Sequence, residues 1–230
     1  ITVWKEPLKV RMRTMVKSLM HKLIVEDSTQ CFTAMPDYVL VLTKKGDNAV
    51  PVTHPEGLKR YFGATPILPN ILRAFNNANE TNFTEDELWA YLRNTYADHK
   101  DPKSNKLSHY IWQRYASSVW DDIRIDNVLP FRDSKEEDDE KHVHPLQLDV
   151  IDRLVELYSN PGEVVLTPFM GVGSEVYSPV SLGRRAIGIE LKDSYFKQAK
   201  INLQLAANRE FEDRSNDQKT LIEDLEAEAD

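Results

Sequence analysis

The stretch VVLTPFMGVGSE, residues 164–175, constrains the fold of this chain more than any other feature. A short apolar run leads into two glycines, and the apolar spacing after them is typical of a helix. A second apolar run, AIGIE, follows at 186–190, and a further helical pattern covers 193–207. Strand, turn, helix, strand and helix in that order make up half of a doubly wound α/β sheet.

Gly171 and Gly173 allow a tight turn and let a ligand approach the N–H groups at the start of the helix. The dinucleotide fingerprint needs a third glycine where Val176 stands, and a phosphate-binding loop needs a lysine that is absent here. S-adenosylmethionine needs only the close glycine turn and a carboxylate for its ribose, which Glu190 offers at the end of the next strand. This cofactor fits best, and a turn that binds no ligand remains the alternative.

The order of the strands also carries information. Only one strand follows the glycine turn, whereas a doubly wound sheet needs about five or more. The other strands must precede the turn, where ITVW (1–4) and the apolar run DYVLVLT (37–43) are typical of strands. The sequence therefore predicts an α/β, Rossmann-like sheet in permuted order, in which residues 1–50 and 108–207 share one sheet.

Composition narrows the class of protein. Hydrophobic residues make up 41% and charged residues 29% of the 230 residues, as in ordinary globular proteins, and no apolar run approaches the length of a membrane span. The single cysteine, Cys31, excludes an internal disulfide framework and fits a reducing cytoplasm. With no second cysteine and six scattered histidines, the sequence argues against a structural zinc site.

Charge is segregated along the chain, whose net charge is −8. Residues 208–230 carry nine acidic side chains against three basic ones, and we expect a frayed helix or disorder there. Residues 1–24 carry six basic side chains against Glu6 alone. These basic side chains either lie on a solvated face or face phosphates, and the sequence leaves both readings open.

The middle of the chain differs from the rest in its amino-acid composition. Prolines and polar residues dominate 51–107, and TEDELWAYLRNTY within it begins with a capping box formed by Thr84 and Glu87. The aromatic segment LSHYIWQRYASSVWDDIR is ambiguous between helix and loop, and the acidic run at 132–141 is typical of a solvated connector. A separate, smaller module is therefore predicted over 51–107.

Three motifs give the chain a family resemblance. They are His144-Pro145-Leu146-Gln147, Pro168-Phe169-Met170-Gly171-Val172-Gly173 and Gly188-Ile189-Glu190. The stretch that contains them closely resembles the C-terminal half of DNA amino-methyltransferases, in the variety that phages and prophages encode. These enzymes methylate the exocyclic amino group of adenine or cytosine in double-stranded DNA, and some belong to restriction-modification systems.

The resemblance implies a cofactor site for S-adenosylmethionine. The residues that it assigns to this site are His144, Pro145, Gln147, Thr167, Pro168, Phe169, Gly171, Gly173, Ser174 and Glu190. The resemblance to the family spans most of 1–45 and 108–205 and is weak over 51–107, where the family places its target-recognition region. It implies four parts: 1–50 as the end of the catalytic half, 51–107 as the recognition insert, 108–207 as the cofactor half and 208–230 as an acidic tail.

The sequence departs from the family pattern in two places. Thr167 stands where the family usually has aspartate, which loses a carboxylate near the ammonium group of the cofactor. The catalytic tetrapeptide with two adjacent prolines and an aromatic residue is absent, because no two of the twelve prolines are adjacent. In permuted order this motif would precede Ile1.

We therefore expect the C-terminal portion of a longer methyltransferase, with no catalytic residue of its own and inactive alone. Its partners would be DNA, the cofactor and either the missing N-terminal segment or another copy of the chain. The alternative is a non-catalytic prophage remnant that binds only DNA or cofactor. A nucleotide-binding module unrelated to methylation is a third reading, which the two failed phosphate-loop patterns disfavour.

For several other side chains, the sequence allows either a functional or a structural role. Lys5, after the first strand, could approach substrate, although an exposed lysine is the commoner outcome. Trp112, Tyr115 and Trp120 could contact bases, although aromatic residues at such spacing more often pack in a core. His144 could order the cofactor or cap the helix that follows it.

Overall fold

The computed structural model describes residues 1–131 and 145–208, except for the side chains of Arg13, Ile24, Ala207 and Asn208. The chain forms two compact units, which we describe separately. Unit 1 comprises Ile1–Ala49, Glu56–Tyr61 and Thr65–Ile125, and unit 2 holds the rest. The acidic connector at 132–141, His144 and the acidic tail, all singled out above, lie outside the described residues.

Unit 1 contains a small mixed sheet with the strand order β2-β1-β3. Strand β1 (Thr2–Val3) pairs antiparallel with β2 (Asp37–Tyr38) and parallel with β3 (Val119–Trp120). The predicted strand at 37–43 is therefore confirmed only at its start. Leu40 and Leu42 are exposed, because no neighbouring strand among the described residues pairs with them.

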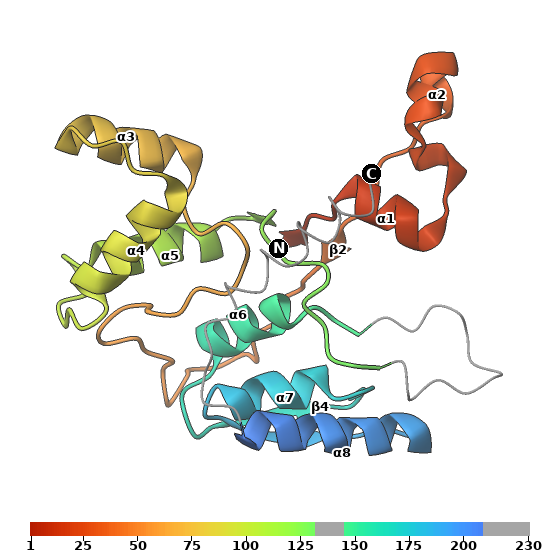
Figure 1. Ribbon diagram of the computed structural model, residues 1–230. Helices are drawn as coiled ribbons and strands as arrows, with labels where there is room; N and C mark the ends of the chain where they lie inside the picture. Colours follow the sequence, from red (N-terminus) through yellow and green to blue (C-terminus); the bar gives the residue numbers. More distant parts are fainter. Residues whose placement is uncertain (132–144, 209–230) are drawn as a thin grey trace. The chain divides into compact units, whose positions relative to one another are not determined.

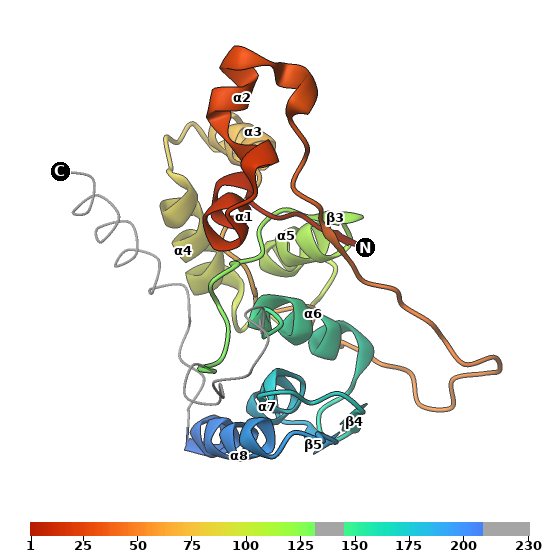
Figure 2. The same ribbon diagram turned by 90° about the vertical axis from the view of Figure 1, so that its right-hand side faces the viewer.

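Residues 16–27 have apolar side chains at helical spacing, which predicts one helix there. Between β1 and β2, the chain forms short helices instead. These are α1 (Pro7–Thr14), η1 (Lys17–Leu19), α2 (His21–Glu26) and η2 (Ser28–Gln30). Met20 adopts an extended conformation between η1 and α2, and this interrupts the helix. Figures 1 and 2 show this segment in red to orange.

Three helices build the core of unit 1 (Figure 1). They are α3 (Pro69–Asn79), α4 (Glu85–Tyr96) and α5 (Lys106–Tyr115), and α5 resolves the ambiguity of the aromatic segment in favour of a helix followed by β3. The predicted capping box is confirmed: the Thr84 side chain accepts from the Glu87 N–H, and the Glu87 carboxylate accepts from the Thr84 N–H. Leu88, Leu92 and Ile111 are fully buried between these helices.

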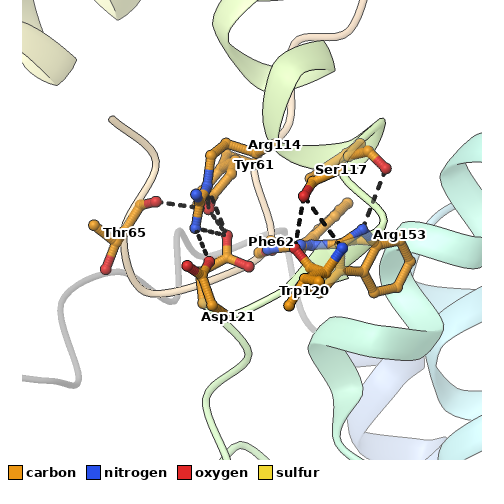
Figure 3. Close-up of polar contacts among 11 residues, drawn as sticks. Tyr61, Phe62, Thr65, Arg114, Ser117, Trp120, Asp121 and Arg153 are labelled. Carbon is orange, nitrogen blue, oxygen red and sulfur yellow. Dashed lines mark hydrogen bonds and ion pairs between the residues drawn. The ribbon is translucent and has the colours of Figure 1, made fainter. Parts of the chain in front are cut away.

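A buried polar cluster ties α5 to β3 and to the loop before α3 (Figure 3). The Arg114 guanidinium, itself buried, lies 2.7 Å from the Asp121 carboxylate and 3.2 Å from that of Asp122. The Tyr61 hydroxyl donates to the Asp122 carboxylate and lies 2.9 Å from the carbonyl oxygen of Thr65. Because Asp122 is almost wholly removed from solvent, this pairing compensates the cost of burying its charge.

Unit 2 contains the predicted strand–turn–helix–strand–helix. Its elements are α6 (Leu148–Tyr158), β4 (Val164–Thr167), α7 (Ser174–Ser181), β5 (Arg185–Gly188) and α8 (Asp193–Asn208). Strands β4 and β5 are parallel, in a register that pairs Thr167 with Gly188. Strand β5 and helix α8 agree to within two residues with the predicted 186–190 and 193–207.

One face of the β4–β5 pair is covered by helices α7 and α8 (Figure 2). Met170, Val176 and Ala199 form a buried cluster there, against which Ala186 of β5 packs. The opposite face is open: Val164, Leu166 and Ile187 are 47%, 63% and 55% exposed. Parallel strands are normally buried on both faces, so this sheet is half covered by the residues that the structure describes.

The expectation of one continuous sheet is not met. In the described part of the chain, β4 and β5 pair only with each other, and the sheet of unit 1 is separate. A continuous sheet needs intervening strands, and none is present in residues 1–131 or 145–208 to pair with both sheets. The α/β class itself is confirmed. None of the described helices is long and apolar enough to cross a membrane.

Candidate cofactor-binding site

The glycine turn lies where β4 ends and α7 begins. The Ile189 N–H donates to the Thr167 carbonyl (3.0 Å), and the Met170 N–H donates back to the Ile189 carbonyl (2.9 Å), so the turn stays attached to the chain beyond β5. The Thr167 hydroxyl accepts from the Phe169 N–H at 3.3 Å. Thr167 thus shapes the turn with its hydroxyl, a role that a short polar side chain after a strand commonly takes.

Glu190 joins the two strand ends. Its Oε2 accepts from the Gly171 N–H at 2.8 Å, and its Oε1 accepts from the Lys192 N–H at 2.9 Å. A carboxylate has about four acceptor positions, so these two bonds leave capacity for hydroxyl donors of a ligand. Glu190 therefore stands beside the glycine turn, as the sequence predicted, and it also holds the turn in place.

The two glycines of the turn meet different surroundings. Both have positive φ, +54° for Gly171 and +101° for Gly173. A Cβ on Gly173 would lie 3.1 Å from the Cα of Ala199 in α8, whereas a Cβ on Gly171 would meet no atom within 4 Å. Gly173 is therefore required by helix packing, and Gly171 leaves open space beside its N–H, where a ligand can approach.

The N-terminus of α7 supplies further polar groups. Gly173 is the N-cap and has no side chain to accept from the first N–H groups of the helix. Ser174 is only 2% exposed, and its Oγ has no hydrogen-bond partner among the described residues. An unpaired buried hydroxyl at the start of a helix whose N-cap residue has no side chain is suited to a polar ligand.

Glu175 was not singled out from the sequence, although it lies in the first turn of α7. Burial raises the pKa of its carboxyl group above the ordinary value, and a hydrogen bond from its own backbone N–H partly opposes that rise. A glutamate in the first turn of a helix normally interacts favourably with the helix dipole. Its presence there therefore gave no indication from the sequence that its carboxyl group would be buried.

The remaining predicted cofactor residues are less tightly grouped. Pro168 and Phe169 belong to the turn, and the Phe169 ring is exposed. Pro145 and Gln147 come just before α6, which packs against α7. Gln147 is buried, and among the described residues neither Pro145 nor Gln147 has a hydrogen bond to the glycine turn. The structure thus groups Thr167 to Ser174 with Glu190, and places the 145–147 segment on the neighbouring helix.

The remaining candidate residues, the lysine after β1 and the aromatic residues of 112–120, take mainly structural roles. The Lys5 ammonium pairs with the Asp37 carboxylate of the adjacent strand at 2.7 Å. Tyr115 and Trp120 are buried, and the Trp120 indole donates to the Tyr115 carbonyl. They pack in the core of unit 1, whereas Trp112 on the same helix is exposed.

Comparison with known proteins shows similar sequences among DNA methyltransferases. The chain is 30% identical over 110 residues to the DNA adenine methyltransferase YhdJ of Escherichia coli K12, covering 47% of this chain and 34% of that protein. It is 38% identical over 62 residues to the type II methyltransferase M1.MboII of Moraxella bovis, covering 27% of this chain and 24% of that protein. The match thus spans about a third or less of the length of these relatives.

Among solved structures, TTHA0409 of Thermus thermophilus, assigned as a DNA modification methylase and solved with S-adenosyl-L-methionine, is 30% identical. The match covers 42% of this chain and 32% of that one, with a TM-score of 0.33, which is too low to define a shared fold. The profile of the DNA methylase family matches residues 3–201, which is most of the 230-residue chain. The chain therefore belongs to the N6/N4 DNA methylase family.

Proposed function

We propose that the glycine turn of unit 2 binds S-adenosylmethionine. The observation that carries the proposal is the hydrogen bond from the Gly171 N–H to the Glu190 carboxylate, because it places an acceptor for ribose hydroxyls beside an open backbone turn. Ser174, with its unpaired buried hydroxyl, and the N–H groups of α7 provide donors. Gly171 provides the space. The residues present therefore fit this cofactor.

The reaction that the family implies is transfer of a methyl group to an exocyclic amino group of adenine or cytosine in DNA. The bound cofactor would supply a methyl group already activated on a sulfonium. The contribution of this chain would be to hold and orient the cofactor at the carboxyl ends of β4 and β5, as ligands are held in open α/β sheets. The family's target base is turned out of the duplex before methylation.

We infer that this chain does not methylate DNA alone. The sequence contains no pair of adjacent prolines, so the catalytic tetrapeptide of the family is absent from it. The open apolar face of the β4–β5 pair supports the same inference, since Val164, Leu166 and Ile187 would be covered in a complete doubly wound sheet. A polypeptide that carries the catalytic half, or another copy of this chain, would cover that face.

We further propose that residues 51–107 form the target-recognition insert, with 1–50 completing the catalytic half and 108–207 forming the permuted cofactor half. Helices α3 and α4 lie within the insert, and the Phe75 ring of α3 packs against the Tyr91 ring of α4, with 5.7 Å between the ring centroids. The alternative function is that of a prophage remnant that binds DNA or cofactor and transfers nothing. The missing tetrapeptide is the observation that favours this alternative.

Calorimetry with S-adenosylmethionine tests the proposed site. We expect saturable one-to-one binding by the chain, and no binding when Glu190 is replaced by alanine. Absence of binding by the folded wild-type chain would overturn the proposal. Transfer of a labelled methyl group to DNA by this chain alone would instead contradict the inference that its catalytic motif is missing.

A further inference from the structure

Residues 5–26, which include α1, η1 and α2, form a segment that we call the basic arm. The arm carries all six basic residues counted in 1–24, whereas the whole chain has a net charge of −8. The cations are Lys5, Lys9, Arg11, Arg13, Lys17 and Lys22. Six of the 29 lysine and arginine residues of this acidic protein thus lie on one short segment with only two acidic side chains, Glu6 and Glu26, at the red end of the ribbon (Figure 2).

Three cations of the basic arm, Arg11, Lys17 and Lys22, are weakly engaged within the protein, whereas Lys5 and Lys9 pair with carboxylates. Arg11 and Lys17 form no ion pair with any residue that the structure describes. The Lys22 ammonium lies 3.2 Å from the carboxylate of Glu26 one turn away, and both side chains are largely exposed. Exposed ion pairs of this kind contribute little to stability, so a phosphate could replace the carboxylate at little cost.

The basic arm also lacks a core of its own. No side chain that the structure describes between Trp4 and Gly57 is buried. The helices α1 and α2 are eight and six residues long, and isolated helices shorter than about 12 residues are marginal in water. A binding partner would therefore stabilise the conformation of the arm.

The pattern on α1 indicates which partner fits. Leu8, Met12 and Met15 form an exposed stripe at helical spacing, and Lys9 and Arg11 flank it on either side. An apolar protein surface laid over the stripe would desolvate the flanking charges, which costs free energy unless they are paired. The phosphate backbone of DNA would instead neutralise them and release counterions.

We propose that the basic arm binds the phosphate backbone of double-stranded DNA independently of the recognition insert. The proposal rests on the proposed function, since it assumes that DNA is the substrate. It assigns to Arg11, Lys17 and Lys22 contacts that position the duplex without reading its sequence. A second protein that covers Leu8, Met12 and Met15 is the competing occupant.

The test measures binding of the full chain to a labelled DNA duplex by fluorescence anisotropy across a salt series. The variant Arg11→Gln/Lys17→Gln/Lys22→Gln removes three charges and keeps good helix formers. The matched control Lys44→Gln/Lys45→Gln/Lys200→Gln removes three exposed charges elsewhere. We expect the arm variant to bind roughly tenfold or more weakly at low salt, with a log–log salt slope shallower by about 2 to 3, since each phosphate contact contributes about 0.9.

Three outcomes would overturn the proposal. One is an equal loss in the arm and control variants, which indicates a general charge effect. Another is wild-type affinity in the arm variant combined with weaker binding in Leu8→Ser/Met12→Ser, which points to the apolar stripe. The third is no DNA binding by the wild type. Calorimetry with S-adenosylmethionine on the arm variant separates the proposals, because cofactor binding at Glu190 should be unchanged even if the arm proposal fails.

Discussion

The Gly171 N–H donates to Glu190 Oε2 at 2.8 Å, and this bond joins the turn after β4 to the chain after β5. The same carboxylate accepts from the Lys192 N–H through its other oxygen. One side chain thus fixes the geometry of the glycine turn and presents the acceptor that the proposed ligand would use. Both roles follow from the position of Glu190 at the carboxyl end of a parallel strand pair.

Replacing Glu190 should therefore affect binding and stability together. Glu190→Ala should abolish measurable binding of S-adenosylmethionine and lower the free energy of unfolding by about 1 to 3 kcal/mol, because two N–H groups lose a charged acceptor. Calorimetry and urea unfolding give the two quantities. Asp193→Asn, an exposed change at the start of α8, is the control and should alter neither. Unchanged cofactor binding in Glu190→Ala would contradict the role proposed for this carboxylate.

The two glycines of the turn should separate packing from binding. Gly173→Ala should destabilise the protein, because the new methyl group would press on the Ala199 backbone at a φ of +101°. Gly171→Ala meets no atom within 4 Å and should cost only about 1 to 2 kcal/mol for its left-handed conformation, yet it should weaken cofactor binding strongly by filling the approach to the turn. Thermal unfolding and calorimetry of both variants check this. Equal binding by Gly171→Ala and the wild type would place the ligand elsewhere.

Glu175 should make stability depend on pH in a definite direction. Its carboxyl pKa is raised in the folded protein by burial, so its favourable contribution is present at low pH and is lost as the pH rises through the folded-state pKa. The variant Glu175→Gln should therefore gain stability over the wild type as the pH rises from about 4 to 7. Urea unfolding at several pH values measures the difference. A difference that shrinks as the pH rises would reverse the sign of the argument.

The buried cluster of unit 1 should respond asymmetrically to substitution. Arg114→Met removes the guanidinium that lies 3.2 Å from the buried Asp122 carboxylate and should cost about 3 to 5 kcal/mol. Asp121→Asn removes the more exposed partner, whose side chain is 59% exposed, and should cost about 1 kcal/mol or less. Urea denaturation compares the two free energies of unfolding. Similar losses in the two variants would show that Asp122 is not the carboxylate that depends on Arg114.

The sequence predicted unit 2 well and parts of unit 1 poorly, for physical reasons. The strand–turn–helix–strand–helix of 163–207 is specified by local apolar periodicity and by Gly171 and Gly173, so its elements could be placed from the sequence. The segment 16–27 has helical spacing, but none of its described side chains is buried, and it breaks at Met20. Periodicity records which face would be buried, and it cannot show whether a partner surface is present.

The candidate site was predicted in the same uneven way. Glu190 and the turn were placed correctly, because both follow from the order of the elements. The hydrogen bond between Glu190 and Gly171, the unpaired hydroxyl of Ser174 and the raised pKa of Glu175 depend on packing in three dimensions. The missing cover on Leu166 and Ile187 is likewise visible only once the helices are seen on the opposite face.

Titration of the purified 230-residue chain with S-adenosylmethionine tests the central claim most directly. Calorimetry should show saturable binding at one site per chain, lost in Glu190→Ala and retained in Asp193→Asn. If the wild-type chain is folded, with a cooperative unfolding transition, and releases no heat of binding at any cofactor concentration, the glycine turn between β4 and α7 is not a cofactor site.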